Sequence, residues 1–269
     1  MSGRIGRAFE TAARERRGAF VPFLTSGFPD PAESDRLALA LCEEGVDALE
    51  LGVPFSDPIA DGPTIQRTTE IALRAGATLP HVLGQALRLR ARCETPLVLM
   101  SYLNPILRYG AERFAEDAAA AGVDGLILVD LPPEEEPALW DVVRKQGLDT
   151  IALLAPGTDD ARLSAIVGKA RGFLYVVARL GVTGRGSSDA SVESALARCR
   201  ERSPLPRCLG FGIDLKTPLD RYRGMAEGVI VGSSLLESIL AGSDARAREV
   251  NARAFARAMK VRLPALAPL

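Results

Sequence analysis

Residues 125–130 read Gly-Leu-Ile-Leu-Val-Asp, and this run decides between the possible folds. An uninterrupted apolar stretch bounded by glycine and aspartate is typical of a short strand that is buried on both faces. Strands of this kind belong to parallel sheets, because the connecting helices cover both faces of the sheet. The stretch therefore predicts a parallel sheet flanked by helices.

Similar runs recur along the chain and alternate with segments of helical period. The strand candidates are Ala19–Thr25, Ala48–Gly52, Leu97–Ser101, Gly125–Asp130, Thr150–Ala155, Phe173–Ala178, Arg207–Phe211 and Gly228–Val231. The helix candidates between them are Pro31–Glu44, Ala111–Ala121, Glu134–Lys145, Asp159–Lys169 and Ser191–Arg202. Alternating strands and helices imply parallel pairing through crossover helices, and eight such units close a barrel.

The sequence thus predicts an α/β protein, a single (β/α)8 TIM barrel. The structural rival is an open doubly wound sheet, but the turn after the first strand, Thr25–Pro29, lacks the expected GxGxxG opening. No composition shift or linker marks a second domain, so we expect residues 1–269 to form one domain. We expect an extra N-terminal helix, extended loops after the second and sixth strands, and a final amphipathic helix after Gly242. Its expected core contacts are Val250, Phe255, Ala256 and Met259.

Composition excludes several classes of function. Lys and Arg number 33 against 34 Asp and Glu, so no basic excess favours a nucleic acid or an anionic membrane as partner. The longest apolar runs have strand length, far short of the roughly 20 residues of a membrane span. The first twenty residues lack a continuous apolar stretch, which predicts a cytoplasmic protein without a signal peptide. The four cysteines form no CxxC or Cys/His metal pattern, so we expect no metal site.

His81 is the only histidine, which restricts the possible catalytic chemistry. Ser-His-Asp or Cys-His catalysis would have to use this residue. It follows Pro80 at the expected start of a helix, where a surface or capping role is favoured over catalysis. Acid–base chemistry must then fall to carboxylates or tyrosines.

Active sites of (β/α)8 barrels lie at the carboxyl ends of the strands, which gives a short list of candidates. They are Glu50, Asp61, Tyr102, Asp130, Tyr175 and Thr183. By period-2 alternation, Glu50 points opposite to Leu49 and Leu51, either into the barrel or under a helix. Burying a carboxylate is costly unless it is paired or functional. The sequence leaves a structural ion pair and a catalytic acid with a raised pKa equally open for Glu50.

Asp61 lies in a loop rich in glycine and proline after the second strand. Taken alone, it is best interpreted as a turn or cap residue ahead of the helix that begins near Pro63. Its place on the catalytic face of the barrel favours a catalytic role more than the local sequence does.

Three glycine-rich segments follow late strands of the expected barrel: Gly181–Gly184, Gly210–Gly212 and Gly232–Ser234. The last of them opens a helix. Loops after strands seven and eight, together with a helix N-terminus, form the common phosphate site of such barrels, because backbone N–H groups and the helix dipole favour an anion. The segments therefore predict a phosphate-binding site.

The stretch Leu49–Gln66, which reads LELGVPFSDPIADGPTIQ, resembles the signature of the tryptophan synthase alpha subunit family. Further blocks resemble the family in the same order: Val21–Phe23, Leu99–Pro105, Asp130–Glu135, Gly181–Gly184 and Gly210–Ile213. The similarity runs from about Phe20 to about Leu240.

This resemblance implies a carbon–carbon lyase of tryptophan biosynthesis, which splits indole-3-glycerol phosphate into indole and glyceraldehyde 3-phosphate by a retro-aldol reaction. It implies that Glu50 is the principal acid and base, that Asp61 accepts the indole N–H, and that Tyr175 lies beside the reacting carbons. The implied substrate-binding residues are Phe23, Met100, Tyr102, Thr183, Gly184, Phe211, Gly212, Gly232 and Ser233. No cofactor is implied in this chain. Pyridoxal phosphate is expected only in a beta subunit, with which the chain would form an α2β2 complex.

Other functions stay open at this point. The chain could be a free-standing indole-3-glycerol-phosphate lyase, or a non-catalytic barrel subunit that binds and activates a beta subunit. Keeping both Glu50 and Asp61 argues against the non-catalytic reading. Another phosphate-binding barrel enzyme would be expected to use Lys or an Asp/Cys pair at its strand ends, and the first four strand candidates contain no Lys.

Overall fold

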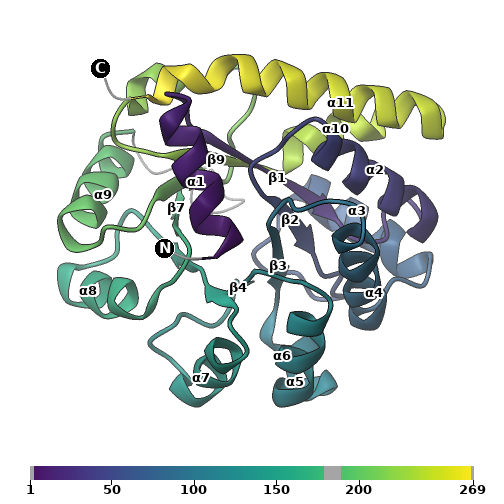
Figure 1. The fold of residues 1–269 in the computed structure, drawn as a ribbon, viewed down its shortest axis with the longest axis horizontal. Helices are drawn as coiled ribbons and strands as arrows, with labels where there is room; N and C mark the ends of the chain where they lie inside the picture. The colour runs from purple at the N-terminus through teal and green to yellow at the C-terminus, as the bar shows by residue number, and fades with distance from the viewer. Residues whose placement is uncertain (1–2, 179–188, 268–269) are drawn as a thin grey trace.

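The computed structural model describes residues 3–178 and 189–267. All strand pairs in this part of the chain are parallel. The strands are β1 (Ala19–Thr25), β2 (Leu49–Gly52), β3 (Leu97–Ser101), β4 (Gly125–Leu128), β5 (Asp149–Thr150), β6 (Ala152–Leu154), β7 (Leu174–Val177), β8 (Arg207–Gly210) and β9 (Gly228–Val231). Their order around the sheet is β5-β4-β3-β2-β1-β9-β8-β7-β6. The last strand, β9, thus pairs with the first, β1, and the sheet forms the predicted barrel (Figure 1).

The helices form the outer layer of the barrel (Figure 1). They are α1 (Arg4–Arg14), α2 (Pro31–Glu43), α3 (Pro63–Arg74), α4 (Leu79–Arg90), α5 (Leu103–Tyr109), α6 (Ala111–Ala120), α7 (Pro137–Lys145), α8 (Asp160–Lys169), α9 (Asp189–Arg202), α10 (Ser233–Leu240) and α11 (Ala245–Arg262). Short 3-10 helices cover Leu219–Tyr222 and Leu263–Leu266. None of the helices described here is long and apolar enough to cross a membrane.

The expected fifth strand is interrupted, so the described part of the chain forms nine strands where eight were expected. Asp149 and Thr150 pair with β4, whereas Ala152–Leu154 pair with β7. Ile151 lies between the two short strands and still donates its N–H to the carbonyl of Leu126 (3.0 Å). The barrel wall is therefore continuous beside the first residues of β4. Toward the carboxyl end of β4, the strands on the two sides separate.

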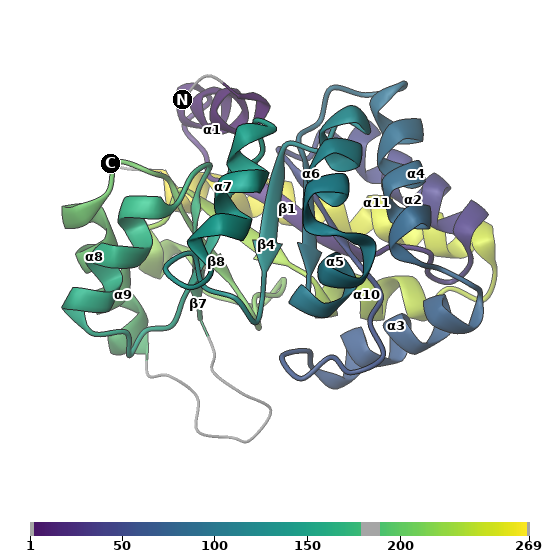
Figure 2. The same ribbon diagram turned by 90° about the horizontal axis from the view of Figure 1, so that it is seen from below.

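The expected N-terminal helix is α1, and it covers the amino-terminal end of the barrel. Figure 2 shows α1 at the opposite end of the molecule from α3. Its buried side chains include Ile5 and Phe9, and the Phe9 ring lies 5.6 Å from that of Phe173. The opposite end, where the carboxyl ends of the strands meet, is left for a functional site.

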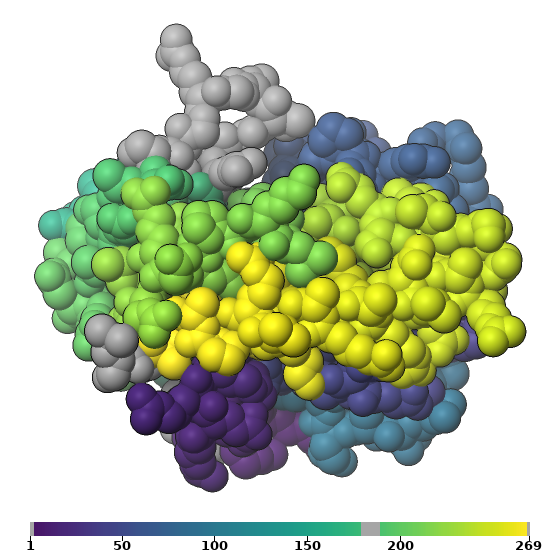
Figure 3. All heavy atoms as spheres, turned by 90° about the horizontal axis from the view of Figure 1, so that it is seen from above, coloured from purple at the N-terminus to yellow at the C-terminus, as the bar shows by residue number. Residues whose placement is uncertain are grey.

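The expected final helix is α11, and one of its predicted core contacts is wrong. Phe255, Ala256 and Met259 are buried, but Val250 is 57% exposed. Figure 3 shows α11 lying along the outer surface of the molecule, close to the N-terminal segment. Other differences are at element ends, where α7 begins at Pro137 instead of Glu134 and β4 ends at Leu128 instead of Asp130.

Candidate active site

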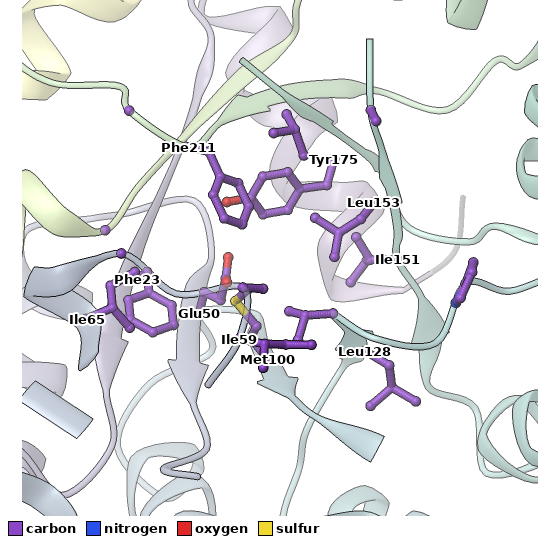
Figure 4. A pocket seen from close by; sticks show the side chains of 18 of the residues that line it. Phe23, Glu50, Ile59, Ile65, Met100, Leu128, Ile151, Leu153, Tyr175 and Phe211 are labelled. Carbon is purple, nitrogen blue, oxygen red and sulfur yellow. The ribbon is translucent and has the colours of Figure 1, made fainter. Parts of the chain in front are cut away.

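A cavity of about 630 Å³ lies at the carboxyl ends of the strands (Figure 4). It gathers eight of the residues that the sequence singled out: Phe23, Glu50, Met100, Tyr175, Phe211, Gly212, Gly232 and Ser233. They come from β1, β2, β3, β7 and the segments after β8 and β9, which lie far apart in the sequence. The barrel therefore brings these eight residues together in one place, whereas Asp61 and Tyr102 are not among the residues that line the cavity.

Glu50 projects into this cavity from β2, in register with Phe23 of β1 and Val98 of β3. Its side chain is fully buried, and neither carboxyl oxygen has a hydrogen-bond partner among the described residues. Burial, and then the nearby charge of Asp61, raise the pKa of Glu50 to about 8. A buried carboxyl without a structural partner, protonated near neutral pH, favours the catalytic reading of Glu50 over the ion-pair reading.

Asp61 lies in the loop between β2 and α3 and is also buried. Burial raises its pKa to about 6, and a hydrogen bond from the Tyr102 hydroxyl opposes the rise. The same hydroxyl accepts the N–H of Ala60 (2.9 Å), so Tyr102 holds both the loop and the carboxylate. Helix α3 is capped by Gly62, without a side-chain cap, so Asp61 does not have the capping role that its sequence position favoured.

Two glycines make room for the aromatic side chains of the site. A Cβ on Gly52 would lie 2.4 Å from the Phe23 ring, and a Cβ on Gly210 would lie 2.2 Å from the Tyr175 ring. Tyr175 in turn packs against Phe211, with ring centroids 5.5 Å apart. The aromatic walls of the cavity therefore depend on the absence of side chains on neighbouring strands.

The segments after β8 and β9 form an end of the cavity suited to an anion. Phe211 and Gly212 both have positive φ (63° and 84°), and Gly232 precedes α10 without a side-chain cap. The first N–H groups of a helix have no partner inside it and carry the positive end of its dipole. Ser233, the first residue of α10, lines the cavity together with Gly212 and Gly232. This arrangement fits a phosphate group.

Several residues around the cavity carry no signal that sequence reasoning used. Leu153 in β6 and Val177 at the end of β7 share the inward parity of Tyr175, which could have identified them. Leu128 at the end of β4 has the opposite parity, because its neighbour Ile127 is the residue in register with Met100. Arg162 and Ile166 come from α8, and nothing in their sequence context marks them as site residues. Ile65 of α3 lies within the stretch Leu49–Gln66 that carries the resemblance, but no role was predicted for it.

The remaining candidates lie elsewhere. Thr183 and Gly184 lie outside the described residues. Asp130 accepts the N–H of Leu103 (2.8 Å) at the start of α5, a structural role. His81 is in the first turn of α4 and does not line the cavity. Within residues 3–178 and 189–267, no group of His, Cys, Asp and Glu is placed to hold a metal ion.

Comparisons with known proteins agree with this geometry. A family model described as tryptophan synthase alpha chain matches residues 9–263. The chain is 48% identical over 235 residues to the tryptophan synthase alpha chain of Geobacter sulfurreducens, covering 87% of this chain and 89% of the relative. It is 43% identical over 258 residues to that of Solibacter usitatus, covering 96% and 97%.

Solved structures are similar over nearly the whole chain. One is a tryptophan synthase from Mycobacterium tuberculosis, with 35% identity and a TM-score of 0.88 over 98% of this chain and 99% of that chain. Another is tryptophan synthase subunit alpha from Legionella pneumophila, with 36% identity and a TM-score of 0.87 over 97% and 98%.

Proposed function

The chain belongs to the tryptophan synthase alpha chain family, and from this premise we propose that Glu50 and Asp61 carry out its reaction. The reaction is the cleavage of indole-3-glycerol phosphate to indole and glyceraldehyde 3-phosphate, so the chain is a carbon–carbon lyase of tryptophan biosynthesis. The observation that carries the residue assignment is the fully buried carboxyl of Glu50, which has no hydrogen-bond partner among the described residues and lines the cavity.

Glu50 moves a proton twice in the proposed mechanism. The bond to be broken joins indole C3 to a carbon that bears a hydroxyl, and an aromatic indole is a poor leaving group. Protonated Glu50 first donates its proton to C3, which gives an indolenine. The carboxylate then takes the hydroxyl proton, a carbonyl forms on the glyceryl fragment, and the electrons of the broken C–C bond return to the ring. A pKa of about 8 supports this role, because the group is protonated at neutral pH before the first step.

Asp61 stabilises the charge that this first step creates. Protonation at C3 leaves a positive charge centred on the ring nitrogen, whose N–H can donate to a carboxylate. A pKa of about 6 leaves Asp61 ionised at neutral pH, so this buried carboxylate can accept that hydrogen bond. Tyr102 positions Asp61 through its hydroxyl.

The cavity walls support the binding of the two ends of the substrate. The phosphate would lie against Gly212, Gly232 and Ser233, where α10 begins without a side-chain cap and its first N–H groups have no partner within the helix. The indole ring would pack against Phe23 and Met100, with Tyr175 and Phe211 beside the reacting carbons. Thr183 and Gly184, outside the described residues, keep their proposed roles beside Asp61 and the phosphate.

The family and its solved relatives support a beta subunit as partner. We propose an α2β2 complex in the cytoplasm, in which the beta subunit takes up the indole and holds the pyridoxal phosphate. No cofactor is proposed for this chain, since proton transfer and charge stabilisation suffice for the cleavage.

The test is indole release from indole-3-glycerol phosphate by the purified chain, with and without a tryptophan synthase beta subunit. Slow release that the beta subunit accelerates supports the proposal, and fast release that it leaves unchanged indicates a free-standing lyase. No release in either case indicates a non-catalytic subunit.

The Glu50→Gln variant tests the residue assignment. It keeps the size of the side chain and removes the titrating group, so we expect indole release to fall by a factor of at least about 10³. Glu112→Gln, an exposed substitution on α6, is the matched control and should release indole normally. Near-normal turnover by a folded Glu50→Gln variant would remove Glu50 from the mechanism.

A further inference from the structure

The wall of the barrel is open between β4 and β6. On the edge that faces away from β3, β4 pairs only through Gly125 and Leu126, which pair with the two residues of β5. Strand β6 pairs with β7. Across the fully described segment 125–154, Ile127 and Leu128 thus have no strand partner on the β6 side. The carboxyl halves of β4 and β6 face each other across a gap in the sheet.

The cavity extends into this gap. Arg162 and Ile166 belong to α8, in the outer helix layer, yet they line the same cavity as Glu50 inside the barrel. Val129 and Ala155, which directly follow β4 and β6 on the two sides of the gap, line the cavity together with these residues of α8. We call this extension the side cleft and define it by Val129, Pro133, Ala155, Thr158, Arg162 and Ile166.

The side cleft suits a small uncharged group. Val129, Pro133, Ala155 and Ile166 present carbon atoms. The cation at the cleft is already paired, because Arg162 Nε donates to Glu134 Oε1 at 2.8 Å. This ion pair joins α8 to the loop after β4, and so connects the two sides of the cleft. An apolar group entering the cleft would bury apolar surface without leaving a charge unpaired.

The ring of the substrate would end at the mouth of this cleft. The phosphate end of the site follows β8 and β9, while the cleft lies between β4 and β6, on the other side of the barrel. Figure 4 shows Glu50 between Phe23 on one side and Ile151, Leu153 and Leu128 on the other. With the pyrrole carbon C3 at Glu50 and the phosphate at Ser233, the benzene edge of the indole is the part that reaches Leu128 and Leu153.

We propose that the side cleft accepts substituents on the benzene edge of the indole, so that the chain also cleaves ring-chlorinated and ring-methylated indole-3-glycerol phosphates. The inference rests on the proposed function. Ala155, which directly follows β6, is the residue that sets the substituent specificity, because its short side chain leaves the cleft open beside Leu153. The bond changes are those of the parent reaction, with a substituted indole as the product.

The experiment compares kcat/KM for indole-3-glycerol phosphate and its 4-, 5-, 6- and 7-chloro analogues. We expect wild-type protein to cleave at least one analogue within about tenfold of the parent substrate. Ala155→Ile fills the cleft and should lower kcat/KM for that analogue by roughly 10- to 200-fold, the range for one misfitting group in an apolar pocket. The parent substrate should change by less than about twofold.

Two further variants make the result specific. Ala161→Ile adds the same bulk on the exposed face of α8, outside the cavity, and should leave every substrate unchanged. Ala155→Val adds less bulk and should give an intermediate loss, which keeps the test valid if Ala155→Ile folds poorly.

Two outcomes would overturn the inference while leaving the proposed function intact. One is normal cleavage of the parent with every chloro analogue more than about 100-fold slower. The other is an equal loss for parent and analogue in the Ala155 variants. If wild-type protein fails to cleave the parent substrate itself, the proposed function fails, and the inference fails with it.

Discussion

Glu50 and Asp61 are both carboxyl groups held out of water, but their surroundings raise the two pKa values by different amounts. Glu50 has no hydrogen-bond partner among the described residues and faces the charge of Asp61, whereas Asp61 receives a hydrogen bond from Tyr102. Near neutral pH one group is therefore an acid and the other an anion. The proposed reaction needs this pair of protonation states.

The pH dependence of kcat/KM should follow from these two groups. Activity should fall as the pH rises through about 8, because Glu50 then lacks the proton that it must donate. It should also fall as the pH drops through about 6, because protonated Asp61 no longer carries the charge that stabilises the ring nitrogen. A pH–rate profile measured from pH 5 to 9.5 should thus be bell-shaped.

The Asp61→Asn variant separates the two limbs. It should lose the limb near pH 6 and cleave about 10²–10³ times more slowly. The alkaline limb should persist but move below pH 8, because the charge of Asp61 contributes to the raised pKa of Glu50. A low-pH limb that persists in this variant would show that another group titrates there.

Gly210 at the end of β8 leaves the space that the Tyr175 side chain of β7 occupies. Gly210→Ala would place a methyl group 2.2 Å from the Tyr175 ring, closer than real contacts allow. Because the ring must move, we expect kcat/KM to fall at least about tenfold and the stability to fall by about 1–3 kcal/mol. Steady-state kinetics and urea unfolding measure the two effects.

Gly168→Ala on α8 is the matched control, since a Cβ there meets no atom within 4 Å. It should leave kinetics unchanged and stabilise the helix by about 0.5–1 kcal/mol. Equal kinetic losses in both variants would mean that the contact with Tyr175 does not explain the effect of Gly210→Ala.

The linker between α4 and β3 contains the cysteine that we expect to react first. The pKa of the Cys93 thiol is lowered by a hydrogen bond with Cys42 of α2, and further by hydrogen bonds with Thr95 and the charge of Arg90. Burial raises the pKa of Cys199 to about 11 and also raises the pKa of Cys208 well above its ordinary value. The thiolate is the reactive form, so iodoacetamide at pH 7 should label Cys93 well before the other two.

Peptide mass spectrometry over time measures this order, and Cys93→Ser is the control that should abolish the fast labelling. Equally fast labelling of Cys199 in the folded protein would contradict the prediction.

The elements could be predicted from the sequence where a local pattern decides the outcome. Runs such as residues 125–130 identify strands because burial on both faces leaves no polar position. The split of Thr150–Ala155 into β5 and β6 could not be predicted, because an apolar run does not say which neighbour each half pairs with. The side cleft follows from that split, so its helix residues Arg162 and Ile166 were also missed.

Val250 shows a different limit of sequence reasoning. Positions five apart are about 140° apart around a helix, so Val250 and Phe255 of α11 cannot both face the hydrophobic core of the protein. Of the two, Phe255 faces the core, since Ala256 and Met259 on the same side are buried. For the site, Glu50 could be placed on β2, but its lack of a partner depends on residues from distant strands, and only the fold reveals it.

At the scale of the whole molecule, the last helix is tied to the first part of the chain by ion pairs. Arg253 and Arg257 of α11 bind Glu43 (2.6 Å) and Glu44 (2.6 Å) at the end of α2. Arg248 binds Glu33, near the start of α2, with 2.9 Å between Nη2 and Oε2. These pairs hold α11 along the barrel where Figure 3 shows it, and so join chain segments more than 200 residues apart in sequence.

The pairs should contribute unequally, because burial decides what an ion pair is worth. The Glu33 side chain is only 4% exposed, whereas Arg257 is 68% exposed. Arg248→Met would leave the buried Glu33 carboxylate without its partner and should lower the free energy of unfolding by about 3 kcal/mol. Arg257→Met, the same change on the same helix, should cost less than about 1 kcal/mol. Urea unfolding measures both.

Adding Glu33→Gln to Arg248→Met should recover part of the lost stability, because it removes the unpaired buried charge. Equal losses from the two arginine variants, or a further loss in the double variant, would mean that α11 is held by its apolar face alone. In that case Phe255, Ala256 and Met259, which pack into the core, would account for the attachment of the last helix, and the ion pairs would fix only its direction along the surface.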